Sequence, residues 1–500
     1  MQPKNISVVW KRRSRTTLGS VLALGAAVVF ATLFASFAII MLPWFFVIPI
    51  AIIPIGLAIT FAYPEVAVAI LLAAVFGVIP GFVLPSIPLL GGRIRPEDLG
   101  IIAFFFILLV RHAGRVGPSL VLIRPYLLPL GSLLVVAAIS AVYALMLKKT
   151  PARDIFNEIR PFYYWLILPL LPLAVDSEAR LNRFLRLLLI LALLLAAGML
   201  IQSVAGVRLF QGARVMGLTT VDETFGGIIR STSPGEIFMH GAFVYLCAAY
   251  AMRRPIPVWL LILAGGLLAG GIIVGFTRGM WISVIIGLGL LALYSKQPRY
   301  LSLAAVLVTA GVIGVSVLSV TNPRYLDAVT ERVTKIDAEI KSGSSFGRRK
   351  IEMDYAIPKI VDHPFAGVGL GGQYKPHTLE AFGWEGETRY IHTLYVALAT
   401  KLGLPGLICA VWFVSFALWR SWRITRMPAR DPAITFTALW TLLTATVITS
   451  VTQPNLVSTS GVATVALAIF LMETQVVREA PGSESGSRFP LRRYQRLRAA

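Results

Sequence analysis

The amino-acid sequence predicts an all-α protein that crosses a membrane many times. Hydrophobic residues make up 57% of the 500-residue chain, and charged residues only 14%. Soluble globular proteins carry about 25% charged residues, so most of this surface must face something other than water. Apolar runs of about 20 residues, the length at which a helix spans a bilayer, recur along the chain. These observations predict a polytopic transmembrane helical bundle.

About fourteen apolar segments approach the length of a span, and two early ones are short enough to be re-entrant, so 12–14 crossings are predicted. Either even number places both termini on one side of the membrane. The basic N-terminus resembles a signal peptide, but its apolar run continues to Tyr63 without a convincing cleavage site, so we expect uncleaved first helices. The predicted spans are 18–41, 44–62, 65–80, 99–112, 126–147, 155–175, 181–206, 234–252, 257–276, 279–296, 300–320, 393–422, 432–451 and 456–474.

Clustered basic residues predict which side is cytoplasmic, because cytoplasmic loops of membrane proteins are enriched in Lys and Arg. The net charge is +22, and no basic stripe with interleaved aromatic residues occurs, so the lipid bilayer or a phosphorylated substrate is expected as partner and nucleic acid is not. Lys148 and Lys149 fall on the opposite side and are the exception. The cytoplasmic clusters are Arg12 and Arg13; Arg111, Arg115 and Arg124; Arg180, Arg183 and Arg186; Arg253 and Arg254; Lys296 and Arg299; Arg420, Arg423, Arg426 and Arg430; and the tail.

This topology divides the chain into five regions. The longest polar interruption faces outward, and a loop of that length is unusual unless it is functional. The C-terminal tail is rich in Ser, Gly and Arg, a composition typical of disorder. The regions are a basic cytoplasmic N-terminus, 1–17; transmembrane helices with short loops, 18–320, including an outward segment at 207–233; a large outward loop, 321–391; C-terminal transmembrane helices, 392–475; and a basic cytoplasmic tail, 476–500.

The long outward loop contains a pattern of its own. Its apolar side chains recur at helical spacing, which predicts an amphipathic helix that lies at the membrane surface or caps the bundle. Pro358 should kink this helix or end it. Gly367, Gly369 and Gly372 match a dinucleotide fingerprint in spacing only, so we expect them to allow tight turns close to backbone or ligand. The stripe comprises Met353, Ala356, Ile357, Ile360 and Val361, with Arg348, Arg349, Lys350, Glu352 and Lys359 around it.

Arg278 lies between two apolar segments, near the predicted outer boundary of the membrane, in Gly275-Phe276-Thr277-Arg278-Gly279-Met280-Trp281. An arginine inside a bilayer costs about 2.5–3.5 kcal/mol on insertion scales, so one that faces inward usually has an anionic partner. A guanidinium fork suits pyrophosphate well. The alternative is an arginine whose head snorkels to the interface, and this motif alone leaves both interpretations open.

Arg214 and Arg230 lie in the shorter outward segment, 207–233. Ser233 is expected to cap the next helix, with Pro234 as its first residue and Glu236 completing a capping box. A helix N-terminus attracts phosphate, so Arg230 beside it is the better phosphate candidate.

His392 stands where the long outward loop enters the next span. Histidine exchanges a proton near neutral pH and can serve as a general base. The alternative is a capping or interfacial histidine. No HExxH or similar ligand spacing occurs around His363, His377 or His392, so no metal site is predicted.

In this combination the motifs resemble the bacterial O-antigen ligase/polymerase family of membrane glycosyltransferases. The resemblance covers roughly residues 230–410, and the rest agrees only as hydrophobic spans. Thr393 departs from the family pattern, in which asparagine commonly follows the histidine. The motifs are Thr277-Arg278-Gly279-Met280-Trp281; an arginine-led helix from Arg348 to Val361; His363-Pro364-Phe365-Ala366-Gly367-Val368-Gly369; and His392, opening a span that reaches Gly403-Leu404-Pro405-Gly406.

The resemblance implies a fold like that of the C-type membrane glycosyltransferases, with loop 321–391 in the periplasm and the active site at the outer face of the inner membrane. It implies an inverting, metal-independent transfer, without a cofactor, from an undecaprenyl-pyrophosphate-linked glycan donor. A ligase of lipopolysaccharide biosynthesis would use lipid A-core as acceptor. A polymerase of surface polysaccharide or exopolysaccharide would use a growing glycan, and the sequence does not separate the two.

On this basis Arg278 would bind the donor pyrophosphate, assisted by Arg230 or Arg214, and His392 would accept the proton of the acceptor hydroxyl. Arg348 or Arg349 would contact the glycan or its carrier. Two other functions stay open. A transporter or flippase would have intramembrane charges along a path between two halves, and related internal repeats. The predicted spans contain few acidic residues, and the sequence shows no clear repeat. A non-catalytic subunit of an envelope complex would use the long loop only for docking.

Overall fold

The computed structural model describes residues 56, 58–80, 87–89, 92–112, 120–210, 212, 214–219, 224–252, 256–295, 299–334, 346–376, 388–427 and 431–478. The chain divides into two compact units, Met1–Ile70 and Leu71–Ala500. Of the first unit, only residue 56 and residues 58–70 are described, so predicted span 18–41 and most of span 44–62 lie outside the described residues, as does the tail after residue 478. The second unit contains every element discussed below.

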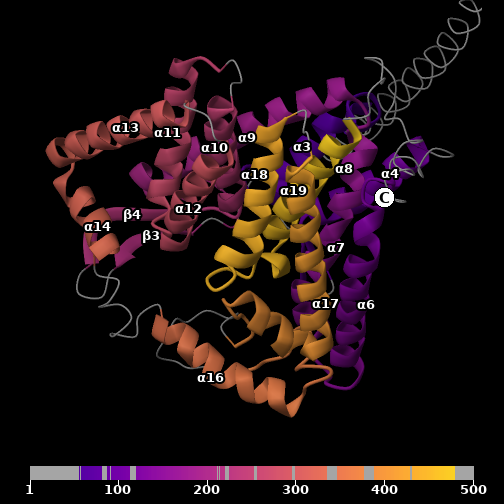
Figure 1. The fold of residues 1–500 in the computed structure, drawn as a ribbon. Coiled ribbons are helices and arrows are strands. Elements are labelled where there is room, and N and C mark those ends of the chain that lie inside the picture. The colour runs from indigo at the N-terminus through magenta and orange to yellow at the C-terminus, as the bar shows by residue number, and fades with distance from the viewer. Residues whose placement is uncertain are drawn as a thin grey trace, which may run out of the picture. The chain divides into compact units, whose positions relative to one another are not determined.

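The described part of the second unit is helical, with two short β-hairpins (Figure 1). Its α-helices are α4 (Pro96–Arg111), α6 (Arg124–Met146), α7 (Ala152–Tyr163), α8 (Ile167–Ala174), α9 (Glu178–Ala205), α10 (Glu236–Ala251), α11 (Val258–Val274), α12 (Arg278–Ser295), α13 (Arg299–Thr321), α14 (Pro323–Thr334), α16 (Phe346–Asp362), α17 (Leu394–Thr425), α18 (Pro432–Leu443) and α19 (Thr459–Arg478); α3 (Pro64–Val75) crosses the boundary between the units. The strands β1 (Ile87–Leu89) and β2 (Gly92–Ile94) form one antiparallel pair, and β3 (Arg214–Thr219) and β4 (Thr224–Thr232) the other.

Five described helices are long and apolar enough to cross a membrane: α6, α9, α12, α17 and α19. Five shorter apolar helices accompany them, beginning at Pro64, Glu236, Val258, Arg299 and Pro432. Leu128, Ile139 and Met146 on α6 are 71%, 63% and 70% exposed, which suits lipid and not water. These features confirm the predicted all-α polytopic membrane fold, while the number of crossings and their orientation remain predictions.

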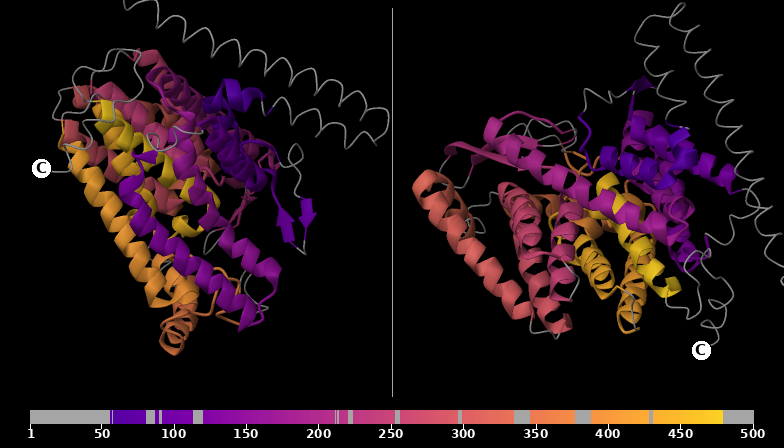
Figure 2. Two further views of the ribbon diagram at one scale, coloured as in Figure 1. Left: turned by 90° about the vertical axis from the view of Figure 1, so that its right-hand side faces the viewer. Right: turned by 90° about the horizontal axis from the view of Figure 1, so that it is seen from above.

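The helices of the bundle pack closely at small residues, as membrane helices commonly do. Helices α6 and α17 run side by side (Figure 2), and α18 lies against α10, α17 and α19. A Cβ atom at Gly287 of α12 would come 2.8 Å from the Trp440 ring of α18. At Gly271 of α11 it would come 2.9 Å from the Met239 sulfur of α10. The glycines therefore allow bulky neighbours to pack directly against the helix backbone.

The predicted span 155–175 is not one helix. It consists of α7, a short 3₁₀ turn (Tyr164–Leu166) and α8. Pro161 and Pro172 lie inside these helices, where proline removes a backbone donor and favours a break. Arg160, near the end of α7, is buried and pairs with the buried Asp98 of α4, Nε to Oδ2 at 3.2 Å. The ion pair and the prolines interrupt what composition alone presents as a continuous span.

The amphipathic helix of the long loop is present as α16, but it does not end at Pro358. It continues to Asp362. Proline deprives the carbonyl four residues earlier of its partner, here that of Asp354. Both Pro358 and Asp354 are exposed, so water can satisfy that carbonyl and the helix tolerates the proline.

The glycine-rich segment after α16 packs against backbone, as expected from the sequence. Gly367 has a φ of +63°, and a Cβ atom there would lie 2.4 Å from the Thr400 carbonyl oxygen. The Val368 amide donates to that oxygen at 2.8 Å, and the Leu404 amide donates to Pro364 O at 2.7 Å. Gly403 itself, at φ +70° and ψ −176°, breaks the helical geometry inside α17. The segment thus fits into a kink of a membrane helix, and no dinucleotide fingerprint is involved.

Candidate functional site

The hairpin β3–β4 brings Arg214 and Arg230 onto one face. Arg214 pairs with Thr232, and Met216 pairs with Arg230. Side chains alternate along a strand and paired residues share a face, so both arginines extend from the same side of the hairpin. The opposite side faces α9, because buried Ser231 accepts a hydrogen bond from Gln202 Nε2 at 2.8 Å. The arginine face is therefore directed away from α9.

Arg230 contacts the turn that precedes α12. Its Nε donates to Gly275 O at 2.9 Å, and its Nη2 donates to Thr277 Oγ1 at 3.3 Å. The next residue, Arg278, is the first of α12. Arg230 therefore reaches the helix N-terminus at which Arg278 stands, where backbone amides and the helix dipole favour an anion.

The turn itself is strained and held from two sides. Phe276 has a φ of +45°, which is rare for a residue with a side chain and costs on the order of 1–3 kcal/mol. Its buried ring packs with Ile228 of β4 and Ala328 of α14. Figure 1 shows the hairpin, α12 and α14 together in this region. Such strain persists only where the surroundings enforce it, which is common at functional sites.

His392 is held by a carboxylate from another helix. Its Nδ1 lies 2.6 Å from Glu352 Oε1, and its backbone amide donates to Glu352 Oε2 at 2.9 Å. The Glu352 side chain is only 8% exposed, whereas that of His392 is 36% exposed and open to a reactant. Helix α16, which carries Glu352, packs on α17 (Figure 1). The edge of the Tyr390 ring contacts the imidazole, with ring centroids 4.8 Å apart.

Tyr390 connects the histidine to the hairpin. Burial raises the pKa of its phenol to about 12, the charge of Arg214 opposes this rise, and the charge of Glu352 adds to it. The phenol of Tyr390 is thus influenced by a charge from the hairpin and by one from α16.

A second connection runs through the loop after α18. The Leu394 amide, two residues after His392, donates to Ser450 O at 2.7 Å. In the same loop, Thr452 Oγ1 lies 3.2 Å from the position of a Cβ atom at Gly279, which follows Arg278. The start of α12 and the start of α17 therefore border one loop, and the arginine and histidine clusters are neighbours.

The two remaining candidates lie on α16. Arg349 is half-buried and precedes Glu352 by three residues, so the two share a helix face. Arg348 belongs to the same helix, and its side chain lies outside the described part of the chain. Among the described residues, no group of three or more His, Cys, Asp or Glu side chains is arranged to hold a metal ion.

The predicted capping box before α10 is wrong. The helix begins at Glu236 and its N-cap is Gly235, without a side-chain cap. Ser233 Oγ instead donates to Phe76 O at 3.3 Å. Glu236 is buried beside Gly275, where a Cβ atom would come 2.8 Å from its Oε1. Its carboxyl therefore lies against the turn before α12 and does not cap its own helix.

Sequence reasoning also missed residues that hold the site. Three residues contact the candidate side chains although no local sequence pattern marks them: Thr277, Glu352 and Tyr390. The hairpin could have been predicted from the sequence, because segments that contain Val, Ile, Thr and Phe lie on both sides of Asp222-Glu223. The role of Glu352 could not, since its pairing spans 40 residues.

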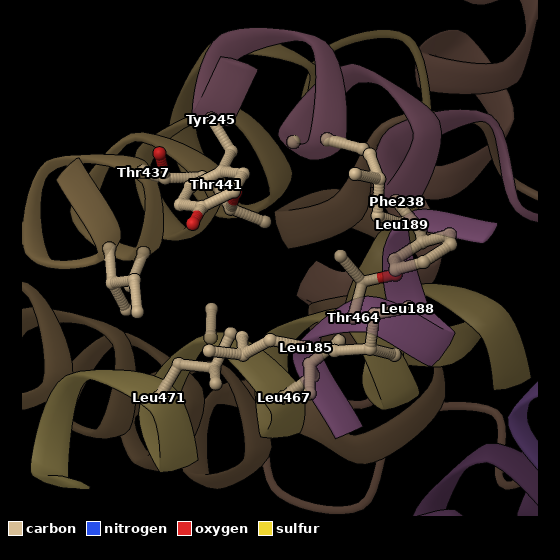
Figure 3. Close-up of a pocket in the computed structure, with 15 residues that line it drawn as sticks. Leu185, Leu188, Leu189, Phe238, Tyr245, Thr437, Thr441, Thr464, Leu467 and Leu471 are labelled. Carbon is tan, nitrogen blue, oxygen red and sulfur yellow. The ribbon is translucent and has the colours of Figure 1, made fainter. Parts of the chain in front are cut away.

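A pocket elsewhere in the bundle differs in chemistry. It lies between α9, α10, α18 and α19 and is lined mainly by leucine, phenylalanine and alanine side chains, with threonine hydroxyls from Thr437, Thr441 and Thr464 (Figure 3). The described residues that line it include no charged side chain. The pocket therefore suits an apolar group, whereas the arginine cluster offers positive charge to an anion.

Fold and site together define a polytopic membrane protein in which an arginine cluster lies beside a histidine–glutamate pair. The profile of the O-antigen ligase family matches residues 260–411, a range that includes Arg278, Arg348, Arg349, Glu352 and His392. This match supports the O-antigen ligase/polymerase family predicted from the sequence motifs. No curated protein matches the sequence. The membrane-spanning helices and the family indicate a protein of the bacterial inner membrane.

Proposed function

We propose that this protein transfers a glycan from an undecaprenyl-pyrophosphate donor to a hydroxyl acceptor at the periplasmic face of the inner membrane. The observation that carries the proposal is the pairing of two clusters. Arg230 contacts the turn that leads into Arg278 at the N-terminus of α12, and His392 lies nearby with its ring held at Nδ1. One cluster suits an anionic leaving group, and the other suits a hydroxyl that must lose a proton.

The arginines would bind the donor pyrophosphate. Charge accumulates on this group as the bond between the anomeric carbon and its phosphate oxygen breaks. Arg278 would face it at the start of α12, with Arg230 beside it and Arg214 on the same hairpin face. Guanidinium forks match phosphate oxygens bidentately and stay charged at any physiological pH, so they can supply this charge without a metal ion.

His392 would act as the general base. Its Nε2 accepts the acceptor's hydroxyl proton while the hydroxyl oxygen attacks the anomeric carbon from the face opposite the pyrophosphate. A new glycosidic bond forms, the bond to pyrophosphate breaks, and undecaprenyl pyrophosphate leaves. Attack from the opposite face inverts the anomeric configuration. Arg349 and Arg348 on α16 would contact the glycan or its carrier.

The experiment is a transfer assay with the purified full-length protein in lipid vesicles containing a lipid-linked glycan donor. Lipid A-core and lipid-linked repeat units are supplied as separate acceptors. One transfer to lipid A-core identifies a ligase, and a ladder of increasing chain length identifies a polymerase. Movement of the donor across the vesicle membrane with no glycosidic bond formed would overturn the proposal in favour of a transporter.

A further inference from the structure

We infer that Glu352 is a positioning residue for His392, which fixes the imidazole tautomer that leaves Nε2 as the proton acceptor. The catalytic part of this inference rests on the proposed function. The tautomer part concerns the protein alone and can be tested without any substrate.

The two oxygens of Glu352 have separate partners on His392. Oε1 lies 2.6 Å from ring atom Nδ1, and Oε2 accepts the backbone amide at 2.9 Å. An ionised carboxylate only accepts hydrogen bonds, so the ring nitrogen that faces it must carry the proton. In the neutral ring, Nε2 then has the free lone pair.

The surrounding packing keeps the carboxylate in register with the ring. Ala356, one helical turn after Glu352, is fully buried with Tyr374, Ile391 and Ala397. The Tyr374 hydroxyl donates to Tyr390 O at 3.1 Å. The Tyr390 ring then contacts the imidazole edge-to-face, with an interplanar angle of 89°. Helix α16 cannot shift along α17 without disturbing both the buried cluster and the carboxylate pair.

One consequence is a coupling between the long loop and the base. Glu352 comes from α16, and the residue it orients lies two positions before the first residue of α17. The histidine is therefore correctly oriented only when α16 is docked on α17. A carboxylate that only holds α16 against His392 would make the same contacts. The test must therefore include an observable that packing alone does not change.

Glutamine at position 352 separates these roles. A glutamine keeps the shape of glutamate but offers one acceptor oxygen and one NH₂ donor, so it can satisfy only one of the two His392 donors. Asp354 provides a matched control, because it is acidic, exposed and two residues away on the same helix. Asp354→Asn removes the same charge without touching the imidazole.

The primary measurement is solid-state NMR of ¹⁵N-histidine-labelled full-length protein in lipid bilayers, at a pH where the ring is neutral. The chain has 5 histidines, and a His392→Gln variant identifies the signal of interest. We expect the Nδ1-protonated tautomer in the wild type and in Asp354→Asn, and a shift toward the Nε2-protonated tautomer in Glu352→Gln. An Nε2-protonated His392 in the wild type would overturn the inference, whatever the variants do.

The second measurement is glycan transfer. Glu352→Gln should lower kcat by about 10²-fold or more, as loss of tautomer control does in acid–base enzymes, with the donor KM changed by less than about threefold. Glu352→Asp keeps the charge on a shorter side chain, so its kcat should lie between those of the wild type and Glu352→Gln. A Glu352→Gln protein with unchanged tautomer and turnover would contradict the inference. A tautomer shift in a protein that forms no glycosidic bond would support the positioning role while rejecting the proposed function.

Discussion

The arginine cluster and the histidine cluster are built in different ways. Arg230 is fixed by a backbone carbonyl and a hydroxyl, at a turn that carries a residue with a φ of +45°. His392 is fixed by a carboxylate from a separate helix. Both clusters depend on partners at least 40 residues away in the sequence. They differ in the chemistry of the partner: neutral oxygen acceptors at a strained turn hold the charge of Arg230, whereas a carboxylate on α16 is needed to set the protonation state of His392.

The largest effect is expected at the histidine cluster. His392→Ala should lower kcat by about 10³-fold, within the range of 10²–10⁴ usual for a general base, while donor binding stays nearly unchanged. The measurement is single-turnover transfer with saturating donor. Arg324→Ala, a change at an exposed arginine of α14, serves as the control and should retain normal rates. A folded His392→Ala protein with near-normal turnover would remove the histidine from the chemistry.

At the arginine cluster, Arg278→Ala should lower kcat by about 10²–10³-fold, because the leaving pyrophosphate loses one preorganised donor. Arg278→Lys should recover only part of this loss, since an ammonium group cannot form the bidentate fork. Steady-state kinetics of both variants test this expectation. Full recovery by lysine would mean that charge alone matters and that the fork geometry does not.

The docking of α16 can be weakened from the glycine-rich segment. Gly367→Ala adds a Cβ atom 2.4 Å from Thr400 O at a φ of +63°, and should destabilise the protein by about 2–3 kcal/mol. Gly289→Ala is the matched control, because the space around Gly289 is open and its helical position favours alanine. Thermal unfolding in detergent compares the two. Equal melting temperatures would show that the segment does not hold its place through Gly367.

The smallest effect is expected at the connection between the clusters. Arg214 is exposed, and its charge acts on the phenol of Tyr390, which contacts the His392 ring. Arg214→Ala should raise the donor KM about tenfold with little change in kcat, and high salt should reduce the difference because exposed charges are screened. Donor titrations at two ionic strengths test this. A loss confined to kcat would instead assign Arg214 to the transition state.

The fold class could be predicted from composition because an apolar run of helical length has few alternatives in a bilayer. The break between α7 and α8 could not be predicted in this way. The ion pair between Arg160 and Asp98 joins residues 62 positions apart, and an averaged hydropathy value does not show single charged residues. The predicted N-cap at Ser233 is wrong for a related reason. Its local pattern favoured a cap, but its hydroxyl donates to the distant carbonyl of Phe76.

The candidate site likewise contains residues that the sequence could identify and residues that it could not. Arg278 and His392 could be singled out because each interrupts or borders an apolar run, which makes a polar residue conspicuous. Arg214 and Arg230 were selected individually, and only the strand register shows that they share a face. Glu352 resembled any charged residue on an amphipathic helix, and tertiary packing alone reveals its partner.

The stereochemistry of the transfer tests the central claim most directly. Purified protein is given a donor of known anomeric configuration and a hydroxyl acceptor, and the new linkage is identified by NMR together with the amount of undecaprenyl pyrophosphate released. Direct attack assisted by His392 predicts inverted configuration and one undecaprenyl pyrophosphate released per bond. Retained configuration would require a covalent glycosyl intermediate or attack from the same face as the pyrophosphate, and would contradict the proposed roles of the arginine and histidine clusters.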